Sequence, residues 1–212
     1  MFVPILITCT HLSQNDESDR FLNRLEHEPV PLSEGKPVGL ILEGAQAGDF
    51  GLAIYRNSLT RDLVVRFYNG ITFSEEITNT VLKTADKYSI PPALAFALCG
   101  VESRFDTNAV GYNEISVDRG LFQLNSLSFP ELAEADFFSL ETNTEEGLKH
   151  LRYCLDRGEN EVVALAMYNA GEGQVSFVGA PMRTLNYISD ILHYRDELEN
   201  RFREVLLEKL SS

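Results

Sequence analysis

Beyond Ser58, apolar residues recur with the spacing of an α-helix along most of the chain. Ser74 stands before two glutamates and an apolar-periodic run, which is the pattern of a helix N-cap, and that helix should end near Tyr88. Pro91 and Pro92 cannot continue a helix, but they suit the first turn of a new one. The sequence therefore predicts two successive helices that meet at these prolines.

The rest of the chain predicts three more helices. One should open at Thr144 and close before Gly158, and another should span about Glu161–Tyr168. In the last stretch, apolar and aromatic residues fall on one helical face, with acids and arginines elsewhere. The residues on this face are Tyr187, Ile191, Tyr194, Leu198, Phe202 and Val205.

Extended structure is expected in two places. The apolar runs Val38–Leu42 and Phe50–Tyr55 are separated by glycines and could pair as a small hairpin, and Ser116–Leu124 suggests a second extended element. The polar stretch Ser13–Lys36, with prolines near its end, is typical of a tether. The chain therefore divides into an N-terminal tether over 1–37, a small accessory segment that could be β over 38–57, and a helical domain over 58–212.

Composition narrows the classes of partner. The chain has 212 residues, 44% of them hydrophobic and 24% charged, so we expect one principal globular domain with a buried core. Acidic residues outnumber basic ones by 32 to 18, and a net charge of -14 would repel a phosphate backbone, which argues against nucleic acid as a partner. Cys9, Cys99 and Cys154 follow no metal-ligand spacing, so neither a metal nor another cofactor is expected.

The first ten residues carry an incomplete export signal. Phe2–Ile7 is apolar, but it is too short to span a bilayer and no basic residues precede it. Leu6–Cys9 resembles a relaxed bacterial lipoprotein box in which Thr8 replaces the usual small residue. Cys9 could therefore be lipidated and attach the protein to a membrane; an ordinary mature terminus and a start that lacks upstream residues are the alternatives.

The helix predicted after the two prolines carries a carboxyl group in an apolar setting. Leu94, Leu98 and Glu102 fall along one helical row, so Glu102 extends the face that should enter the core. An unpaired buried charge is unfavourable, so we expect burial to raise the pKa of Glu102 and to favour the protonated form that a general acid needs. A salt bridge from Glu102 to Arg104 or Arg119 explains this segment equally well.

Two further segments hold polar groups that suit sugars. Gln123 and Asn125 could face the same side of a short extended stretch, where their amides would donate to and accept from hydroxyl and N-acetyl groups. Tyr168 and Asn169 close a helix before Gly171, which can terminate it in the left-handed conformation. Taken singly, the two segments are better explained by a polar turn and by a buried helix end.

In combination and order, these three segments resemble the soluble-type (SLT) lytic transglycosylases, a family with the lysozyme-like fold. Ile90–Phe105 resembles the family's IPP…L…A…VES.F signature. Gly120–Gln123 resembles its GLMQ motif and Ala166–Gly171 its AYNAG motif, with one substitution in each. The resemblance implies a mainly α, lysozyme-like α+β fold with a short β element near the substrate cleft.

The same resemblance implies roles for individual residues. Glu102 falls on the family's catalytic acid, and Gln123 falls on the glutamine near the cleavage subsite. Tyr168 and Asn169 fall on residues that contact the N-acetylated sugar and the glutamate, while Tyr187 resembles a tyrosine that closes the site. The expected substrate-binding residues are Ser103, Gln123, Asn125, Tyr168, Asn169 and Tyr187.

Family enzymes cut the β-1,4 bond between N-acetylmuramic acid and N-acetylglucosamine without consuming water, and they leave an anhydro ring on the muramic acid. The resemblance therefore implies peptidoglycan as substrate and a periplasmic location in the bacterial cell envelope. Asp106, Glu114 and Asp118 lie close enough in sequence to supply a second carboxylate, so a lysozyme-like muramidase is one alternative. A glycan-binding envelope module without turnover is another.

Overall fold

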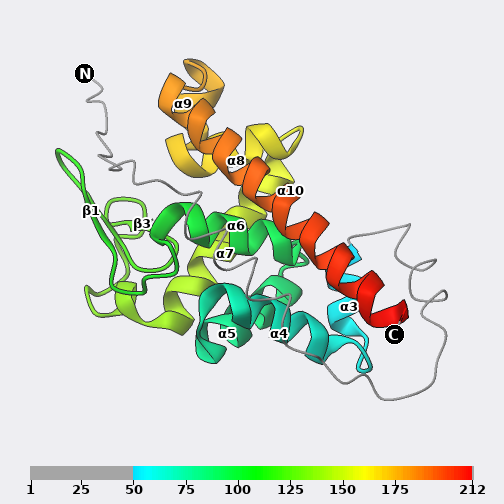
Figure 1. Cartoon of the computed structure of the whole chain (residues 1–212). Helices are drawn as coiled ribbons and strands as arrows, with labels where there is room; N and C mark the ends of the chain where they lie inside the picture. The colour runs from blue at the N-terminus through cyan, green and yellow to red at the C-terminus, as the bar shows by residue number, and fades with distance from the viewer. Residues whose placement is uncertain (1–49, 212) are drawn as a thin grey trace.

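The computed structural model describes residues 50–211, with side chains up to Leu207. Helices form most of this part of the chain, and three short strands interrupt them near its middle (Figure 1). In chain order the elements are α3 (Phe50–Arg56), α4 (Arg61–Thr72), α5 (Glu75–Lys87), α6 (Pro92–Ser103), β1 (Val110–Tyr112), β2 (Val117–Arg119), β3 (Leu124–Asn125), the 3-10 helix η2 (Asp136–Phe138), α7 (Leu140–Arg157), α8 (Glu161–Ala170), α9 (Glu172–Phe177) and α10 (Met182–Ser211). The predicted β structure around Ser116–Leu124 is confirmed.

Helices α5 and α6 begin and end where the local signals predict. Ser74 caps α5, because its side chain accepts a hydrogen bond from the backbone N–H of Ile77 at 3.3 Å. Tyr88 is the C-cap of α5, and Pro92 stands in the first turn of α6. At the other end of α6, Arg104 adopts the left-handed conformation, with φ at 56°, and terminates the helix.

The expected strand over Phe50–Tyr55 is wrong, since these residues form α3. The ring of Phe50 packs against Phe202 of α10, with the ring centroids 6.0 Å apart. A short apolar run fits a helix or a strand equally well, and here a contact with a distant part of the chain accompanies the helix. The other half of the expected hairpin, Val38–Leu42, lies outside the described residues, as does Cys9. The three-segment division of the chain stays a prediction.

Helix α7 begins earlier than predicted. The side chain of Ser139 accepts a hydrogen bond from the backbone N–H of Thr142 at 3.3 Å, so the helix starts at Leu140 and not at Thr144. Thr144 is fully buried inside the second turn. A polar residue followed by two glutamates resembles a cap in sequence, but here it continues a helix that is already formed. The start of α8 at Glu161 agrees with the prediction.

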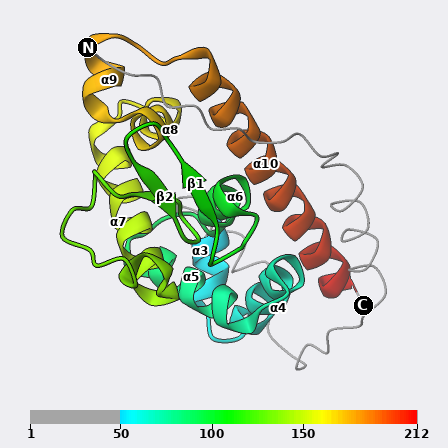
Figure 2. The ribbon, with the colours of Figure 1, turned by 90° about the vertical axis from the view of Figure 1, so that its left-hand side faces the viewer.

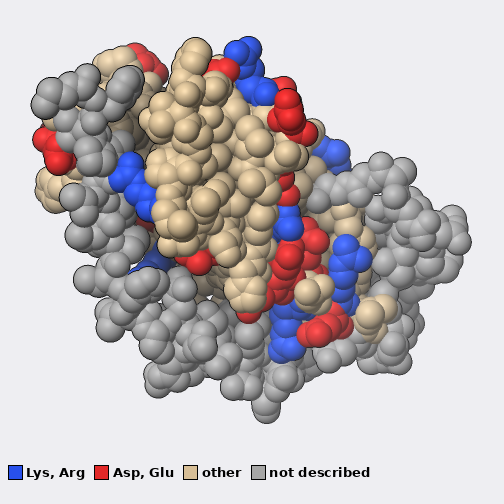
Figure 3. All heavy atoms as spheres, turned by 90° about the horizontal axis from the view of Figure 1, so that it is seen from above, with Lys and Arg blue, Asp and Glu red and all other residues tan. Residues whose placement is uncertain are grey.

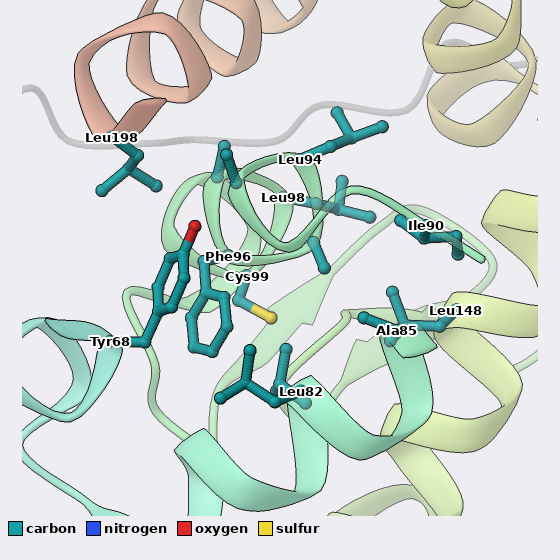
Figure 4. Packing of buried hydrophobic residues seen from close by; sticks show 14 of the residues in the cluster. Tyr68, Leu82, Ala85, Ile90, Leu94, Phe96, Leu98, Cys99, Leu148 and Leu198 are labelled. Atoms are coloured by element: carbon teal, nitrogen blue, oxygen red, sulfur yellow. The ribbon is translucent and has the colours of Figure 1, made fainter. Parts of the chain in front are cut away.

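Helix α6 is the centre of the core. Every residue from Ala93 to Cys99 is buried, and side chains of α4, α5, α7 and α10 surround them (Figure 4). The ring of Tyr68 on α4 stacks on Phe96 with the ring centroids 4.1 Å apart. A helix that is apolar on all sides is expected at the centre of a core, because each of its faces has a partner.

Helix α10 crosses α6 at close range. All the residues predicted for its apolar face are buried or packed against the core: Tyr187, Ile191, Tyr194, Leu198, Phe202 and Val205. A Cβ atom added at Gly100 would lie 2.4 Å from a ring carbon of Tyr194, so the two helices approach this closely only because residue 100 has no side chain. The crossing brings the first turns of α10 to the end of α6.

The strands form one antiparallel sheet in the order β1-β2-β3. Gly111 of β1 pairs with Asp118 of β2, and Asp118 pairs in turn with Asn125 of β3. Figure 2 shows β1 and β2 in front of α6, on the side of the molecule that also carries α8. The sheet therefore borders the central helix.

Charge is unevenly distributed over the described surface. Seen from above Figure 1, on the side of α9, the surface has a broad area without charged side chains, with acidic and basic residues at its margins (Figure 3). The end of α9, the residue that follows it and the start of α10 expose Phe177, Val178 and Met182 at 90%, 73% and 73%. Among the helices of residues 50–211, none is long and apolar enough to cross a membrane.

Candidate active site

Glu102 lies in the last turn of α6 with its side chain partly buried. The phenol of Tyr187, from the start of α10, donates a hydrogen bond to Glu102 Oε1 at 2.5 Å. Burial raises the pKa of Glu102 from 4.5 to about 8; the hydrogen bond from Tyr187 lowers the pKa and the nearby charge of Asp118 raises it further. Glu102 is therefore mostly protonated at neutral pH, which confirms the predicted direction of the pKa.

The salt-bridge explanation of Glu102 is wrong. Arg104 is exposed beyond the end of α6, and the guanidinium of Arg119 lies 3.6 Å from Glu134 and over the ring of Phe137. Within residues 50–207, no ion pair joins Glu102 to an arginine. The acid is held instead by a neutral hydrogen-bond donor, an arrangement that leaves it able to carry a proton.

Two tyrosines from different helices are coupled to the acid by a hydrogen bond or by its charge. Tyr187 contacts Glu102 directly, and the hydroxyl of Tyr168, at the end of α8, donates to the backbone carbonyl of Phe122 at 3.2 Å. Burial raises the pKa of both phenols well above 10, and the negative charge of Glu102 adds to the effect. Both hydroxyls therefore stay neutral and keep their protons as hydrogen-bond donors.

The predicted extended stretch that displays Gln123 and Asn125 together is wrong. Gln123 has a φ of 47° and lies in a tight turn, where the chain changes direction before β3. Its Nε2 donates to the backbone carbonyls of Ala109 and Gly120 at 3.1 and 2.9 Å, so the amide oxygen is the group left for a ligand.

The side-chain amide of Asn125 makes its hydrogen bonds within the hairpin. Its Nδ2 donates to Asp118 Oδ1 at 2.6 Å and to the hydroxyl of Ser116 at 2.8 Å, and its Oδ1 accepts from the backbone of Leu127 at 3.0 Å. The side chain therefore positions Asp118. Its predicted contact with substrate stays a prediction.

Ser103 and Asn169 also make contacts within the protein. The hydroxyl of Ser103 donates to the carbonyl of Cys99, one helical turn earlier, at 3.2 Å, and the residue is 9% exposed. The Oδ1 of Asn169 accepts from the buried hydroxyl of Thr184 at 2.8 Å, which ties the end of α8 to the start of α10. These bonds hold together the elements that carry Tyr168 and Tyr187.

Asn143 is a structural residue of the site that the sequence patterns did not single out. Its side chain is buried and accepts from the backbone N–H of Phe122 at 2.8 Å, and its Nδ2 donates to the carbonyls of Arg119 and Phe137 at 2.9 and 2.8 Å. It fixes the turn that precedes Gln123. An amide four residues before Gly147 and eight before Leu151, on the buried row of α7, is the signal that could have identified it.

His150 lies behind Tyr168. The two ring centroids are 5.1 Å apart, and Phe129 and Tyr153 cover other sides of the imidazole. Burial lowers the pKa of His150, so the ring is uncharged at neutral pH. The imidazole therefore packs behind Tyr168 as part of an aromatic cluster.

Of the three carboxylates proposed as partners for Glu102, the structure brings one close. Asp118 raises the pKa of both Glu102 and Tyr168 by its charge, whereas Asp106 and Glu114 are exposed and contribute to neither. Within residues 50–207, no group of three or more His, Cys, Asp or Glu side chains could hold a metal ion.

A protonated carboxyl group that accepts a hydrogen bond from a neutral phenol can donate its proton to a neutral oxygen of a bound ligand. A family model for the transglycosylase SLT domain matches residues 79–189, more than half of the 212-residue chain. The chain belongs to the transglycosylase SLT family. The resemblance to SLT lytic transglycosylases, which lie in the lysozyme-like superfamily, is thereby confirmed.

The mainly helical SLT domain with its three-stranded antiparallel sheet also confirms the predicted lysozyme-like α+β fold. No solved structure matches the chain significantly. The matched region includes Glu102, Gln123, Tyr168 and Tyr187. Membership of the SLT family supports a glycan-processing function of the lytic transglycosylase type and implies that the domain binds peptidoglycan.

Proposed function

We propose that the protein is a peptidoglycan lytic transglycosylase that cleaves the β-1,4 bond between N-acetylmuramic acid and N-acetylglucosamine, with Glu102 as its single catalytic acid and base. The observation that carries the proposal is the state of Glu102. Burial raises its pKa to about 8, and its hydrogen-bond partner is Tyr187. An acid with a pKa near the working pH can both give and take back a proton, which the reaction requires of one residue.

In the first step, protonated Glu102 gives its proton to the glycosidic oxygen as the bond from that oxygen to the anomeric carbon breaks. The positive charge that develops on the muramic acid ring is stabilised by the substrate's own N-acetyl group. The electron pair of the broken bond stays with the departing oxygen, which leaves as a neutral hydroxyl. The Tyr187 phenol stabilises the carboxylate that remains on Glu102.

In the second step, the carboxylate of Glu102 takes the proton of the muramic acid C6 hydroxyl while that oxygen attacks the anomeric carbon. A 1,6-anhydro ring forms, and Glu102 regains the proton that it gave up. No water is consumed. One carboxyl group is therefore sufficient, as in other substrate-assisted glycosidases.

A lysozyme-like muramidase is the second candidate, and Asp118 is the observation that favours it. Asp118 is the carboxylate close enough to raise the pKa of Glu102, and a second carboxylate could activate a water molecule in place of the C6 hydroxyl. The two reactions give different products, because hydrolysis leaves a reducing end and transglycosylation leaves an anhydro ring.

The substrate implies the place of action. We propose that the protein works in the periplasm of a bacterial cell envelope, with lipidation of Cys9 as its means of membrane attachment. Fractionation of cells that produce the full chain tests the location, and mass spectrometry of the membrane-bound protein tests the lipid. Recovery of the protein in cytosolic fractions alone would contradict this part of the proposal.

Mass spectrometry of muropeptides released from purified peptidoglycan tests the reaction. The protein should release anhydro products, which are one water lighter than hydrolytic ones, and Glu102→Gln should abolish their release because an amide cannot donate the proton. Glu131→Gln removes an exposed carboxylate and is the matched control, which should keep full activity. Reducing-end products would favour the muramidase, and absence of any product would favour a glycan-binding module.

A further inference from the structure

An exposed apolar surface lies where α9 is followed by α10. Phe177, the most exposed large apolar side chain among residues 50–207, is 90% exposed, and its neighbour Val178 is 73% exposed. Met182 is 73% exposed, and Leu185, which lies on the same side of α10, is 46% exposed. The broad area without charged side chains in Figure 3 lies on this side of the molecule. We call these four residues the 177–185 surface.

Hydrogen bonds fix the backbone that carries this surface. The carbonyl of Gln174 accepts from the backbone N–H groups of Val178 and Gly179 at 2.9 and 3.1 Å. The side-chain Nε2 of Gln174 donates in turn to the carbonyl of Gly179 at 3.3 Å. The backbone N–H of Leu185 donates to the carbonyl of Pro181 at 3.1 Å, at the start of α10. The exposure of the apolar side chains is therefore a property of a defined turn.

The 177–185 surface lies outside the core. Thr184, Ile188 and Ile191 are buried, so α10 packs against the core through that row, and Met182 and Leu185 lie on another side of the helix. Helix α9 buries none of its residues. Apolar side chains in water are unfavourable, and a cluster of them on a folded domain marks a contact with a partner or a membrane.

The sequence around this surface has no acidic residue. Between Glu172 and Asp190, Arg183 is the one charged residue, although the whole chain has a net charge of -14. Glu172 is itself paired with Arg157, whose Nη2 lies 2.7 Å from Glu172 Oε1. A bilayer that contains anionic lipids repels acidic residues and attracts basic ones. A strongly acidic protein can therefore approach such a bilayer through a face of this kind.

The shape of the surface favours a bilayer over a protein. Phe177 protrudes, and a protein partner would need a preformed pocket to enclose its ring, whereas the headgroup region of a bilayer accepts an apolar side chain without one. Arg183 is exposed beside Met182 on α10. A long arginine side chain can reach lipid phosphate oxygens while its apolar neighbours enter the bilayer.

We propose that the 177–185 surface binds a phospholipid bilayer, with Phe177 and Met182 inserted among the headgroups and Arg183 at a lipid phosphate. The surface lies at the same end of α10 as Tyr187, the hydrogen-bond partner of Glu102, so this contact holds the proposed active site beside the membrane. The contact requires neither the proposed reaction nor the proposed lipidation, because it uses side chains of the folded domain.

Tryptophan fluorescence tests the contact, because the chain has no tryptophan of its own. Phe177→Trp is introduced into full-length protein that also carries Cys9→Ser and therefore cannot be lipidated. Vesicles of phosphatidylcholine with phosphatidylglycerol should shift the emission to shorter wavelength, and brominated lipids should quench it, because the indole leaves water. Leu59→Trp is the matched control and should show neither effect, since residue 59 is 57% exposed but lies between α3 and α4, away from α9 (Figure 1).

Vesicle sedimentation of the full-length Cys9→Ser protein measures the contribution of the side chains. Replacement of Phe177 and Met182 together by glutamine should weaken binding on the order of tenfold to a hundredfold, because two apolar side chains then stay in water. Arg183→Gln should weaken binding about fivefold on vesicles with phosphatidylglycerol and leave binding to phosphatidylcholine alone unchanged. Leu59→Gln should bind as the parent protein does.

Two results would overturn the proposal. Emission of Phe177→Trp that vesicles leave unchanged would reject the bilayer and leave a protein as the partner of this surface. An equal response of Leu59→Trp would show that lipid contact is not specific to the surface. The vesicle experiments involve no glycan and the muropeptide experiment involves no lipid, so the failure of one proposal is distinguishable from the failure of the other.

Discussion

Replacement of Glu102 by glutamine should make the protein more stable than the wild type at alkaline pH but not at acidic pH. The folded-state pKa of Glu102 is about 8, against 4.5 for a solvated glutamate. Between these two values the unfolded chain releases the proton while the folded chain keeps it, so rising pH favours unfolding of the wild type. Glutamine keeps the shape and the acceptor for Tyr187 but has no proton to lose.

The expected magnitude follows from the same pKa. A folded-state pKa of about 8 in place of 4.5 corresponds to about 5 kcal/mol, because one pKa unit is worth about 1.4 kcal/mol. The side chain is partly exposed, and water screens part of this effect, so we expect about 2–4 kcal/mol. The contribution of Glu102 to stability is fully present below pH 4.5 and is lost as the pH rises through about 8.

Urea unfolding at pH 4 and at pH 9 measures this effect on both proteins. The difference in unfolding free energy, variant minus wild type, should increase by about 2–4 kcal/mol from the lower to the higher pH. Glu131→Gln is the control, since loss of an exposed carboxylate should change stability by less than about 0.5 kcal/mol at either pH. A difference for Glu102→Gln that is the same at both pH values, or that has the opposite sign, would refute the argument that burial keeps Glu102 protonated.

Two further substitutions test the groups around the acid. Tyr187→Phe removes the hydrogen bond that lowers the pKa of Glu102, so the alkaline limb of the pH–activity profile should move up by about one pH unit, while Tyr194→Phe on the same helix should leave the limb in place. Asn143→Ala removes the side-chain partner of three backbone groups, two of them in buried hydrogen bonds, so urea unfolding should show a loss of about 3 kcal/mol or more; a loss below about 1 kcal/mol would show that the Gly120–Gln123 turn does not depend on it.

Local signals were sufficient for the elements in which neighbouring residues decide the structure. Ser74 and Pro92 mark the starts of α5 and α6 through bonds and dihedral angles within one turn, and both were predictable. The Phe50–Tyr55 run failed because its helical form accompanies a contact with Phe202, at the other end of the chain. A short apolar run carries no information about such a partner.

The same distinction applies to the site: features set by neighbouring residues were predictable, and contacts between distant residues were not. The burial of Glu102 follows from its place on the row with Leu94 and Leu98, so the direction of its pKa was predictable from spacing alone. Its bond with Tyr187 joins residues that are 85 positions apart, and no local pattern indicates it. Only the likeness to a family pointed to that tyrosine.

The turn at Gln123 shows why alternation along a chain is a weak guide to which way polar side chains face. Its positive φ reverses the chain just before β3, and both of its amide donors are used on backbone carbonyls, so the residue offers an oxygen and not a mixed donor and acceptor. The same applies to Asn125, whose amide positions Asp118. In this site the residues whose types suit sugar binding are partly used in fixing one another, and Gln123 keeps only its amide oxygen for a substrate.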